Sequence, residues 1–312
     1  MSGINKLTVF AVLASTLTVA ACGGGSGGDS SSTQSTRTTM TVTSATVSSD
    51  ESSSSSSSEA SSSSAAAIRW SVYNASTLPT APGSIALPSG TSSQFTVNVG
   101  TTANYSWVNA FSLPGDGTIS LDTSGTAIEN RSQAYFNNVI NSAGKYPKTI
   151  TFLTRVLPVA GATYDNNNRL LEFDLALADA GVVGARIEGI IRSDAQTQGI
   201  QINKVDGVDL RGTVADMTVP HIYQVSVTLT SPLSGTVAVY VDGNDTPVIG
   251  PVNATNLFTV GAAGDNYVRF GDGRAAYYRS GIDWVVWTAS GAYTPSQLQG
   301  NLPANIGVTT GY

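Results

Sequence analysis

The sequence has 312 residues, of which 15 are Lys or Arg and 21 are Asp or Glu, so its formal net charge is −6. The basic residues form no dense cluster, which excludes recognition of nucleic acid through a basic patch. The single cysteine excludes disulfides within the chain, and the single histidine excludes zinc sites that need two imidazole ligands.

Residues 1–21 are typical of a signal peptide, because an apolar stretch over residues 7–19 ends in small residues directly before Cys22. This ending resembles the lipobox of bacterial lipoproteins, which implies cleavage before Cys22 and attachment of diacylglycerol to its sulfur. Gly23, rather than Asp, follows the cysteine and implies the outer membrane. We therefore expect an outer-membrane lipoprotein facing the cell surface or the periplasm. The alternatives are an ordinary secretory peptide with an incidental cysteine, or a short membrane anchor.

Residues 22–67 consist mainly of Gly, Ser, Thr and Ala, with unbroken serines at 52–58 and 61–64. Such a stretch buries too little apolar surface to offset its chain entropy, so it predicts a disordered tether. A flexible chain of about 45 residues has an end-to-end distance of roughly 35–40 Å. The remaining residues, 68–312, are expected to form one domain.

Alternation of apolar and polar residues with a period of two dominates this domain and predicts many short strands. Gly, Asn and Asp clusters between them are turn signals. Short helices are expected only at residues 131–143 and 294–299. The pattern predicts an all-β, antiparallel two-sheet sandwich. The strands are expected at residues 94–99, 148–156, 169–177, 185–192, 199–205, 222–230, 236–241, 267–271 and 282–288.

The segments at 221–229, 235–243, 268–273 and 281–288 form an ordered series. The series resembles the laminin-G-like and concanavalin A-like jelly rolls over residues 221–298. The resemblance implies a jelly-roll sandwich whose concave face or loop rim meets carbohydrate. It speaks for the fold rather than for one activity, since this sandwich carries lectins, hydrolases and lyases.

Alternation over residues 185–193 places Arg186, Glu188, Ile190 and Arg192 on one face of a strand. Guanidinium groups grip a carboxylate with two parallel hydrogen bonds, so this row is suited to a uronic acid. The alternative is an exposed face whose charges neutralise one another.

Three motifs resemble those of the jelly-roll alginate lyases, which carry Arg-x-Glu-x-Arg, Gln-Ile-His and Tyr-Phe-Lys-x-Gly. The counterparts are Arg186-Ile-Glu188, Gln201-Ile-Asn203 and the segment 277–281, which is Tyr-Tyr-Arg-Ser-Gly. Arg192 comes two residues late, Asn203 replaces the histidine, and the first two motifs lie closer together than in that family.

In that family's terms, Arg186, Gln201 and Asn203 would neutralise the uronate carboxylate and thereby acidify its C5 proton. Tyr278 would abstract this proton and protonate the leaving oxygen. Alternatively, Gln201 and Asn203 form the solvent face of a hairpin strand, and Tyr278 belongs to a loop.

Glycoside hydrolysis is the less favoured chemistry. Glu172-Phe-Asp174 is similar to the start of the Glu-x-Asp-x-x-Glu strand of laminarinase-type hydrolases, but Leu177 occupies the position of the last acid. A retaining glycosidase needs both of its carboxyls. His221, in register with apolar residues, is a candidate base or a structural residue.

Further candidates for carbohydrate binding come from aromatic and basic residues near the C-terminus, because a ring stacks on the apolar face of a sugar. They are Arg274, Tyr277, Arg279 and Trp287, besides Glu188 and Arg192. Trp284 and Trp287 lie on opposite faces of their strand, so at most one of them belongs to the core.

Acidic turn residues, Asp242 and Asp245 above all, are candidate ligands for a structural calcium ion, although turn chemistry alone also explains them. No other cofactor is expected.

The sequence favours a monomeric surface lipoprotein that recognises an extracellular polysaccharide, with uronate as the candidate sugar. A lyase that cleaves a uronate polymer by β-elimination is the first alternative, and whether the protein is an enzyme stays open. A structural or adhesive envelope protein is the second alternative.

Overall fold

The computed structural model describes residues 67–139, 144–165, 167–179, 182–194, 197–260 and 266–312. The predicted signal peptide, Cys22 and nearly all of the predicted tether lie outside these residues. The chain divides into two units, Met1–Ser62 and Ser63–Tyr312, and the fold is that of the second unit. None of the helices in the described residues has the length and apolarity needed to cross a membrane.

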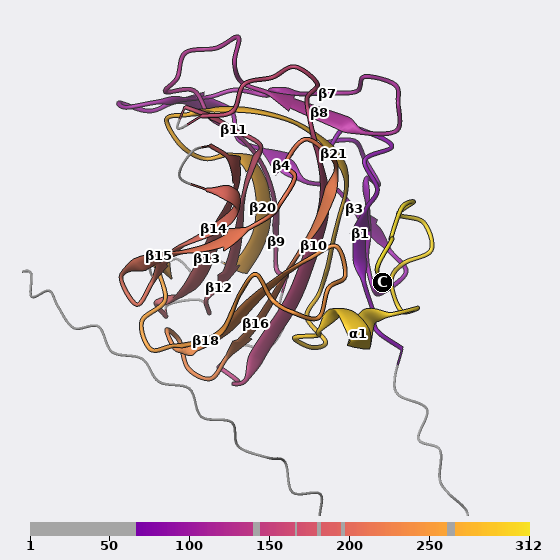
Figure 1. Ribbon diagram of the computed structural model, residues 1–312, viewed down its shortest axis with the longest axis vertical. Coiled ribbons are helices and arrows are strands. Elements are labelled where there is room, and N and C mark those ends of the chain that lie inside the picture. The colour runs from indigo at the N-terminus through magenta and orange to yellow at the C-terminus, as the bar shows by residue number, and fades with distance from the viewer. Residues whose placement is uncertain (1–66, 140–143, 166, 180–181, 195–196, 261–265) are drawn as a thin grey trace, which may run out of the picture. The chain divides into compact units, whose positions relative to one another are not determined.

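Two mainly antiparallel sheets build the domain (Figure 1). Sheet A runs in the order β18 (Ile249–Ala254), β17 (Gly235–Val241), β16 (His221–Leu229), β10 (Lys148–Pro158), β21 (Tyr277–Thr288), β1 (Ser71–Tyr73), β2 (Ile85–Ala86) and β3 (Ser92–Ser93). Sheet B runs in the order β15 (Val208–Thr213), β14 (Gln198–Val205), β13 (Gly184–Ser193), β12 (Leu171–Leu177), β20 (Asn266–Asp272), β9 (Ser132–Asn137) and β4 (Thr96–Val97). The predicted all-β, two-sheet sandwich is confirmed.

Short strands extend these paths. In sheet A, β8 (Ile119–Asp122) pairs with β21 and β7 (Phe111–Ser112), and β11 (Asn168–Arg169) pairs with β21. In sheet B, β19 (Thr259–Val260) pairs with β13. A separate two-stranded hairpin consists of β5 (Gly100–Thr101) and β6 (Ser106–Trp107).

The core lies between the two sheets and follows from the alternation in each strand. Phe152 of β10 stacks on Phe173 of β12 with 5.0 Å between ring centroids. Leu171, Phe173 and Leu175 point into this core, so the alternate residues of β12 point to the outer face of sheet B. Those alternate residues include Glu172 and Asp174, which are nevertheless buried.

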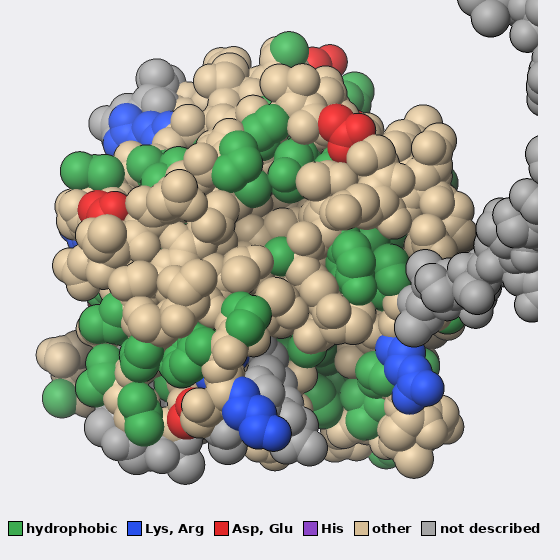
Figure 2. Space-filling view, turned by 90° about the horizontal axis from the view of Figure 1, so that it is seen from below, with side chains coloured by type: hydrophobic (Ala, Val, Ile, Leu, Met, Phe, Trp, Pro, Cys, Tyr) green, Lys and Arg blue, Asp and Glu red, His purple; other side chains and the backbone are tan. Residues whose placement is uncertain are grey.

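The C-terminal segment covers the outer face of sheet A. Trp284 and Leu153 on that face form one apolar cluster with Leu298 and Ile306 of the segment. The segment includes α1 (Pro295–Leu298), which lies on the side of sheet A away from sheet B (Figure 1). Figure 2 shows a surface on which polar side chains and backbone dominate and charged residues are scattered, as the low charge content implies.

The helix expected at residues 294–299 is present as α1, but the helix expected at 131–143 is wrong. Residues 132–137 form β9, an inner strand of sheet B, and residues 140–143 lie outside the described part of the chain. Helix propensity misled the prediction at Gln133 and Ala134, because pairing with β20 and β4 overrides so weak a preference.

Gly189 is a position where the sandwich admits no side chain, because a Cβ there would lie 2.0 Å from Cζ of Phe173. Gly189→Ala should push the Phe173 ring out of its stack on Phe152 and destabilise the protein by about 1–3 kcal/mol. Thermal and urea unfolding measure this loss. Gly125→Ala is the control, since a Cβ at Gly125 meets no atom within 4 Å. Equal stability of both variants would contradict the packing described.

Candidate functional site

The outer face of sheet B carries two rows of mostly polar residues that run across the strands. Cross-strand register places Tyr135, Arg269, Asp174 and Glu188 opposite one another on β9, β20, β12 and β13. The adjacent row consists of Gln133, Gly271, Glu172, Ile190, Gln201 and Arg211. Side chains opposite one another in neighbouring strands lie close enough to interact.

Asp174 is fully buried at the centre of the first row. Arg269 donates a hydrogen bond to one of its oxygens, and Nε of Arg186 lies 3.5 Å from the other. The Arg186 guanidinium also lies 4.2 Å from the centroid of the Phe258 ring, and that of Arg269 lies 5.0 Å from the Tyr267 ring. A buried carboxylate of this kind is tolerated only because two cations face it.

Glu188 is the second buried carboxylate of this row. It forms ion pairs with Arg186 and Arg274 and accepts a hydrogen bond from the amide of Asn203. Asn203 in turn accepts from Gln201.

The same network continues from Gln201 in the second row to Arg192, which lies opposite Gly199. Nη1 of Arg192 donates to Oε1 of Gln201 at 2.9 Å, and Nε of Arg192 donates to Asp194 at 2.6 Å. The polar face is therefore one connected network across several strands.

Glu172 is 2% exposed and lies at the end of β12. It accepts hydrogen bonds from the Tyr278 hydroxyl at 3.1 Å, Nε of Arg274 at 3.2 Å and Nε2 of Gln133 at 3.5 Å. Burial, followed by the negative charge of Asp174, raises the pKa of Glu172 to about 7. Gly273 lies directly against it, since a Cβ there would be 2.1 Å from Oε1.

A cavity of about 480 Å³ opens above these residues. That volume lies within the range of ligand pockets, roughly 300–1,000 Å³. The polar rows form one side of its lining, and the other side is aromatic and basic: Tyr105, Trp107, Arg131, Lys204 and Phe258.

The aromatic side of this lining comes from the β5–β6 hairpin. Tyr105 and Trp107 pack edge to face, with 5.5 Å between their centroids. The Arg131 guanidinium lies 3.8 Å from the centroid of the Tyr105 ring and fixes it there. Both rings are only half-buried, so they remain available to a ligand.

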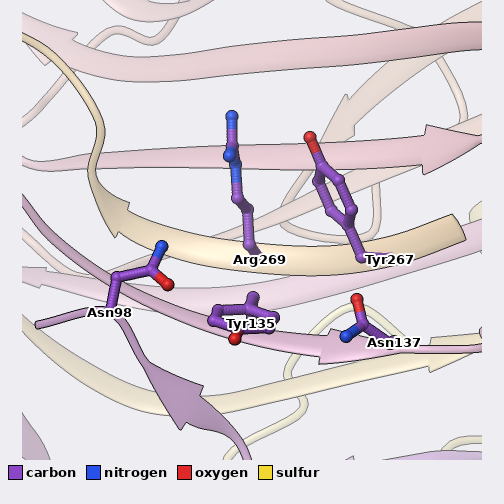
Figure 3. Close-up of a pocket in the computed structure, with 5 residues that line it drawn as sticks. All are labelled: Asn98, Tyr135, Asn137, Tyr267 and Arg269. Carbon is purple, nitrogen blue, oxygen red and sulfur yellow. The ribbon is translucent and has the colours of Figure 1, made fainter. Parts of the chain in front are cut away.

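A second cavity of about 320 Å³ shares Arg269 with the first. Asn98, Tyr135, Asn137 and Tyr267 complete its lining. Tyr267 and Arg269 project to the same side of β20, with Tyr135 and Asn137 on the neighbouring strand β9 (Figure 3). Both cavities lie on the outer face of sheet B, and we refer to the two together as the groove.

The charges of this groove are arranged in layers. Glu172, Asp174 and Glu188 are buried, whereas the Arg274 side chain is 41% exposed and Lys204 is exposed. Solvent and any ligand therefore meet the cations before the carboxylates.

The structure brings together most of the site residues predicted on sheet B. Arg186, Glu188, Gln201 and Asn203 lie in one network with Arg192, and Arg274 lies beside Glu188 and Glu172. Ionic and hydrogen-bonded contacts link all of these side chains. The alternative of an exposed, self-neutralising face agrees with the ion pairs but not with the exposure, because Glu188 and Arg192 are buried.

Tyr278 does not lie in the groove. It is fully buried, and burial raises the pKa of its hydroxyl well above the usual value of 10. A raised pKa makes a tyrosine a weaker candidate for the base of an elimination, and Tyr278 lines neither of the two cavities. The base assigned from the sequence is therefore not supported by its position.

The remaining candidates belong to sheet A, away from the groove. Trp287 is 1% exposed in the core, so its ring cannot stack on a sugar. Tyr277 and Arg279 lie on β21, where Arg279 is 3.6 Å from Asp122. His221 lies on β16, and its Nδ1 is 2.6 Å from Asp242. Its pKa is raised by this hydrogen bond, which fits a structural role.

Sequence reasoning missed Tyr267 and Arg269. Their signal was present, because Tyr267-Val-Arg269-Phe-Gly271 has the same tyrosine, basic and glycine spacing as the segment 277–281. It also missed Gln133 and Tyr135, which were assigned to a helix. Nothing in the sequence singled out Trp107, which enters the site through the hairpin.

Asp242 and Asp245 each have protein partners: Asp242 accepts from the backbone N–H of Ile222 at 2.8 Å, and Asp245 from that of Ser296 at 2.9 Å. The calcium site stays a prediction. In the described part of the chain, the acidic group close enough to share a metal is Glu172, Asp174 and Glu188, within 4.8 Å of one another. Arg186, Arg269 and Arg274 already neutralise that group, so it does not fit a cation.

No protein-family model and no curated protein matches the chain. Among solved structures, the chain is similar to a carbohydrate esterase of the Shiga toxin-encoding bacteriophage phi24B, with 15% identity and a TM-score of 0.39 over 63% of this chain and 90% of that one. It is similar to peanut lectin, with 14% identity and a TM-score of 0.34 over 63% and 97% of the two chains. It is also similar to alginate lyase Aly36B, with 9% identity and a TM-score of 0.37 over 59% and 85%.

Glu172 should make the folded protein less stable as the pH rises from about 4.5 to 7. Its pKa is raised from 4.5 to about 7 on folding, so in this window the folded state keeps a proton that the unfolded state has lost. Urea unfolding between pH 5 and 8 measures the decline, which Glu172→Gln should reduce. The exposed Glu129→Gln is the control. A Glu172→Gln variant that declines as steeply as the natural protein would contradict the assignment.

Proposed function

We propose that the protein binds an acidic, uronate-containing polysaccharide along the outer face of sheet B. The observation that carries this proposal is the layered charge of the groove, in which exposed cations cover buried carboxylates. In a chain with a net charge of −6, this local arrangement favours an anionic ligand. Guanidinium groups suit the carboxylates of such a ligand, because they form paired, charge-assisted hydrogen bonds.

The rest of the lining supports a sugar rather than a small inorganic anion. Tyr105 and Trp107 offer half-buried rings on which the apolar face of a pyranose can stack. Asn98 and Asn137 offer amides that can both donate to and accept from sugar hydroxyls. Since the two cavities share Arg269, a chain of several sugars can occupy both.

The location proposed with this function rests on the sequence around Cys22. A lipid on Cys22 would hold the protein at the outer membrane, and the Ser-rich segment would let the domain reach polysaccharide at a distance from the membrane. Ligand capture at the cell surface is the role that agrees with both features.

Arg274→Gln should weaken binding of alginate or pectate about 10–100-fold, the effect of losing one charged hydrogen bond, of about 1.5–3 kcal/mol. Affinity electrophoresis of the protein from residue 67 onward measures this change, with a neutral glucan for comparison. The effect should shrink at high salt. Arg279→Gln is the matched control, because Arg279 lies on sheet A beside Asp122. Retardation by none of the acidic polymers would contradict the proposed function.

Trp107→Ala should also weaken binding, but with less dependence on salt than Arg274→Gln, because it removes a stacking surface rather than a charge. Trp107→Phe, which keeps a ring, should retain most of the affinity. Titration monitored by calorimetry at two salt concentrations separates the two contributions. Unchanged affinity of Trp107→Ala would place the sugar elsewhere in the groove.

A further inference from the structure

Two carboxyl groups lie close together in the lining of the 480 Å³ cavity, although they come from different strands. Glu172 lies on β12 and Glu188 on β13, two residues out of register, so they are diagonal neighbours on one face, and an oxygen of each lies within 4.8 Å of the other. Retaining glycosidases hold their two carboxyls about 5–5.5 Å apart. Leu177 in the place of a third acid on β12 is therefore no obstacle, because the adjacent strand supplies the second carboxyl.

Gln133 provides an independent indication of a ligand at this place. Its side chain is 1% exposed and lines the same cavity, and its Nε2 donates to Glu172. Its Oε1 has no hydrogen-bond partner within the described residues. A buried acceptor without a partner is costly, and a sugar hydroxyl beside Glu172 would satisfy it.

We propose that Glu172 and Glu188 hydrolyse a glycosidic bond of the bound polysaccharide, with Glu172 as the proton donor and Glu188 as the nucleophile. This inference rests on the proposed function, because the polymer must first occupy the groove.

The surroundings of the two carboxyls suit these different roles. Burial and the charge of Asp174 raise the pKa of Glu172 to about 7, so it holds a proton over much of the range below neutrality. Arg186 and Arg274 face Glu188, and Asn203 donates a hydrogen bond to it. Both cations and the amide are partners of a charged carboxylate rather than of a neutral acid.

The reaction would proceed in two balanced steps. In the first, the Glu172 proton moves to the glycosidic oxygen, the bond from C1 to that oxygen breaks, and a Glu188 oxygen bonds to C1. In the second, water attacks C1, its proton passes to the Glu172 carboxylate, and the bond to Glu188 breaks. One water is consumed, and the anomeric configuration is retained.

The Arg274 side chain has to move away from the two glutamates before a substrate can reach them. It lies between β20 and β21 with its side chain 41% exposed, and it contacts both Glu172 and Glu188. A uronate carboxylate entering the groove would offer its guanidinium an alternative partner, which would open the space above the two glutamates.

The test incubates the protein with alginate, pectate, glucuronan and neutral glucans, and follows new reducing ends, ultraviolet absorbance of unsaturated uronates and electrophoretic retardation. We expect reducing ends without that absorbance. Glu172→Gln and Glu188→Gln should lower the rate about 10²–10⁴-fold while retardation persists, and the exposed Glu129→Gln should match the natural protein.

If the glutamine variants fail to fold, the natural protein itself can be tested with methanol as the acceptor. A retaining enzyme then forms methyl glycosides of retained configuration. Retardation without reducing ends would overturn the hydrolysis and leave the binding function standing. Ultraviolet absorbance, or reducing ends from both glutamine variants at the natural rate, would also overturn it. No retardation by any polymer would instead overturn the proposed binding.

Discussion

The burial of Asp174 on the outer face of sheet B is the constraint on which the rest of the groove depends. An ionised carboxylate out of water costs several kcal/mol unless cations face it at close range. Arg186 and Arg269 meet that requirement, and the rings of Phe258 and Tyr267 lie close to their guanidinium groups. The aromatic side chains of the groove and its cations are thus parts of one electrostatic arrangement, and the cavity is the space that this arrangement leaves open.

The two outer faces of the sandwich differ: that of sheet A is apolar and covered, whereas that of sheet B is polar and lies beside an open cavity. On sheet A, Trp284 and its neighbours are apolar and lie beneath the C-terminal segment, which adds a second core. On sheet B, apolar residues at the equivalent positions would also stabilise the fold, and replacing a buried ion network by apolar groups is often neutral or stabilising. A buried network of arginines and carboxylates beside an open cavity is therefore better explained by recognition than by stability.

The sequence predicted the fold well where alternation was long and strong, as in the strands around Phe152 and Phe173. It failed at β9, because Gln133 and Ala134 favour a helix in isolation and only pairing with β20 makes them a strand. It predicted Arg186, Glu188, Gln201 and Asn203 as neighbours, since they lie on adjacent strands. Tyr278 was misplaced because spacing along the chain does not say to which sheet a strand belongs, and β21 joined sheet A.

The arrangement of strands in the sheet also explains why the hydrolase strand motif did not identify Glu172 and Glu188 as a pair. A strand motif tests positions along one strand, whereas a sheet also brings together diagonal neighbours on adjacent strands, whose long side chains can reach one another. Glu172 and Glu188 are 16 positions apart in the sequence and lie on neighbouring strands of a hairpin. Arg274 contacts both glutamates, so their roles differ through their other neighbours: Glu172 lies beside Asp174, while Glu188 faces Arg186 and accepts from Asn203. The pairing register of the strands in sheet B, rather than the sequence of any single segment, therefore determines which acidic side chains meet in this groove.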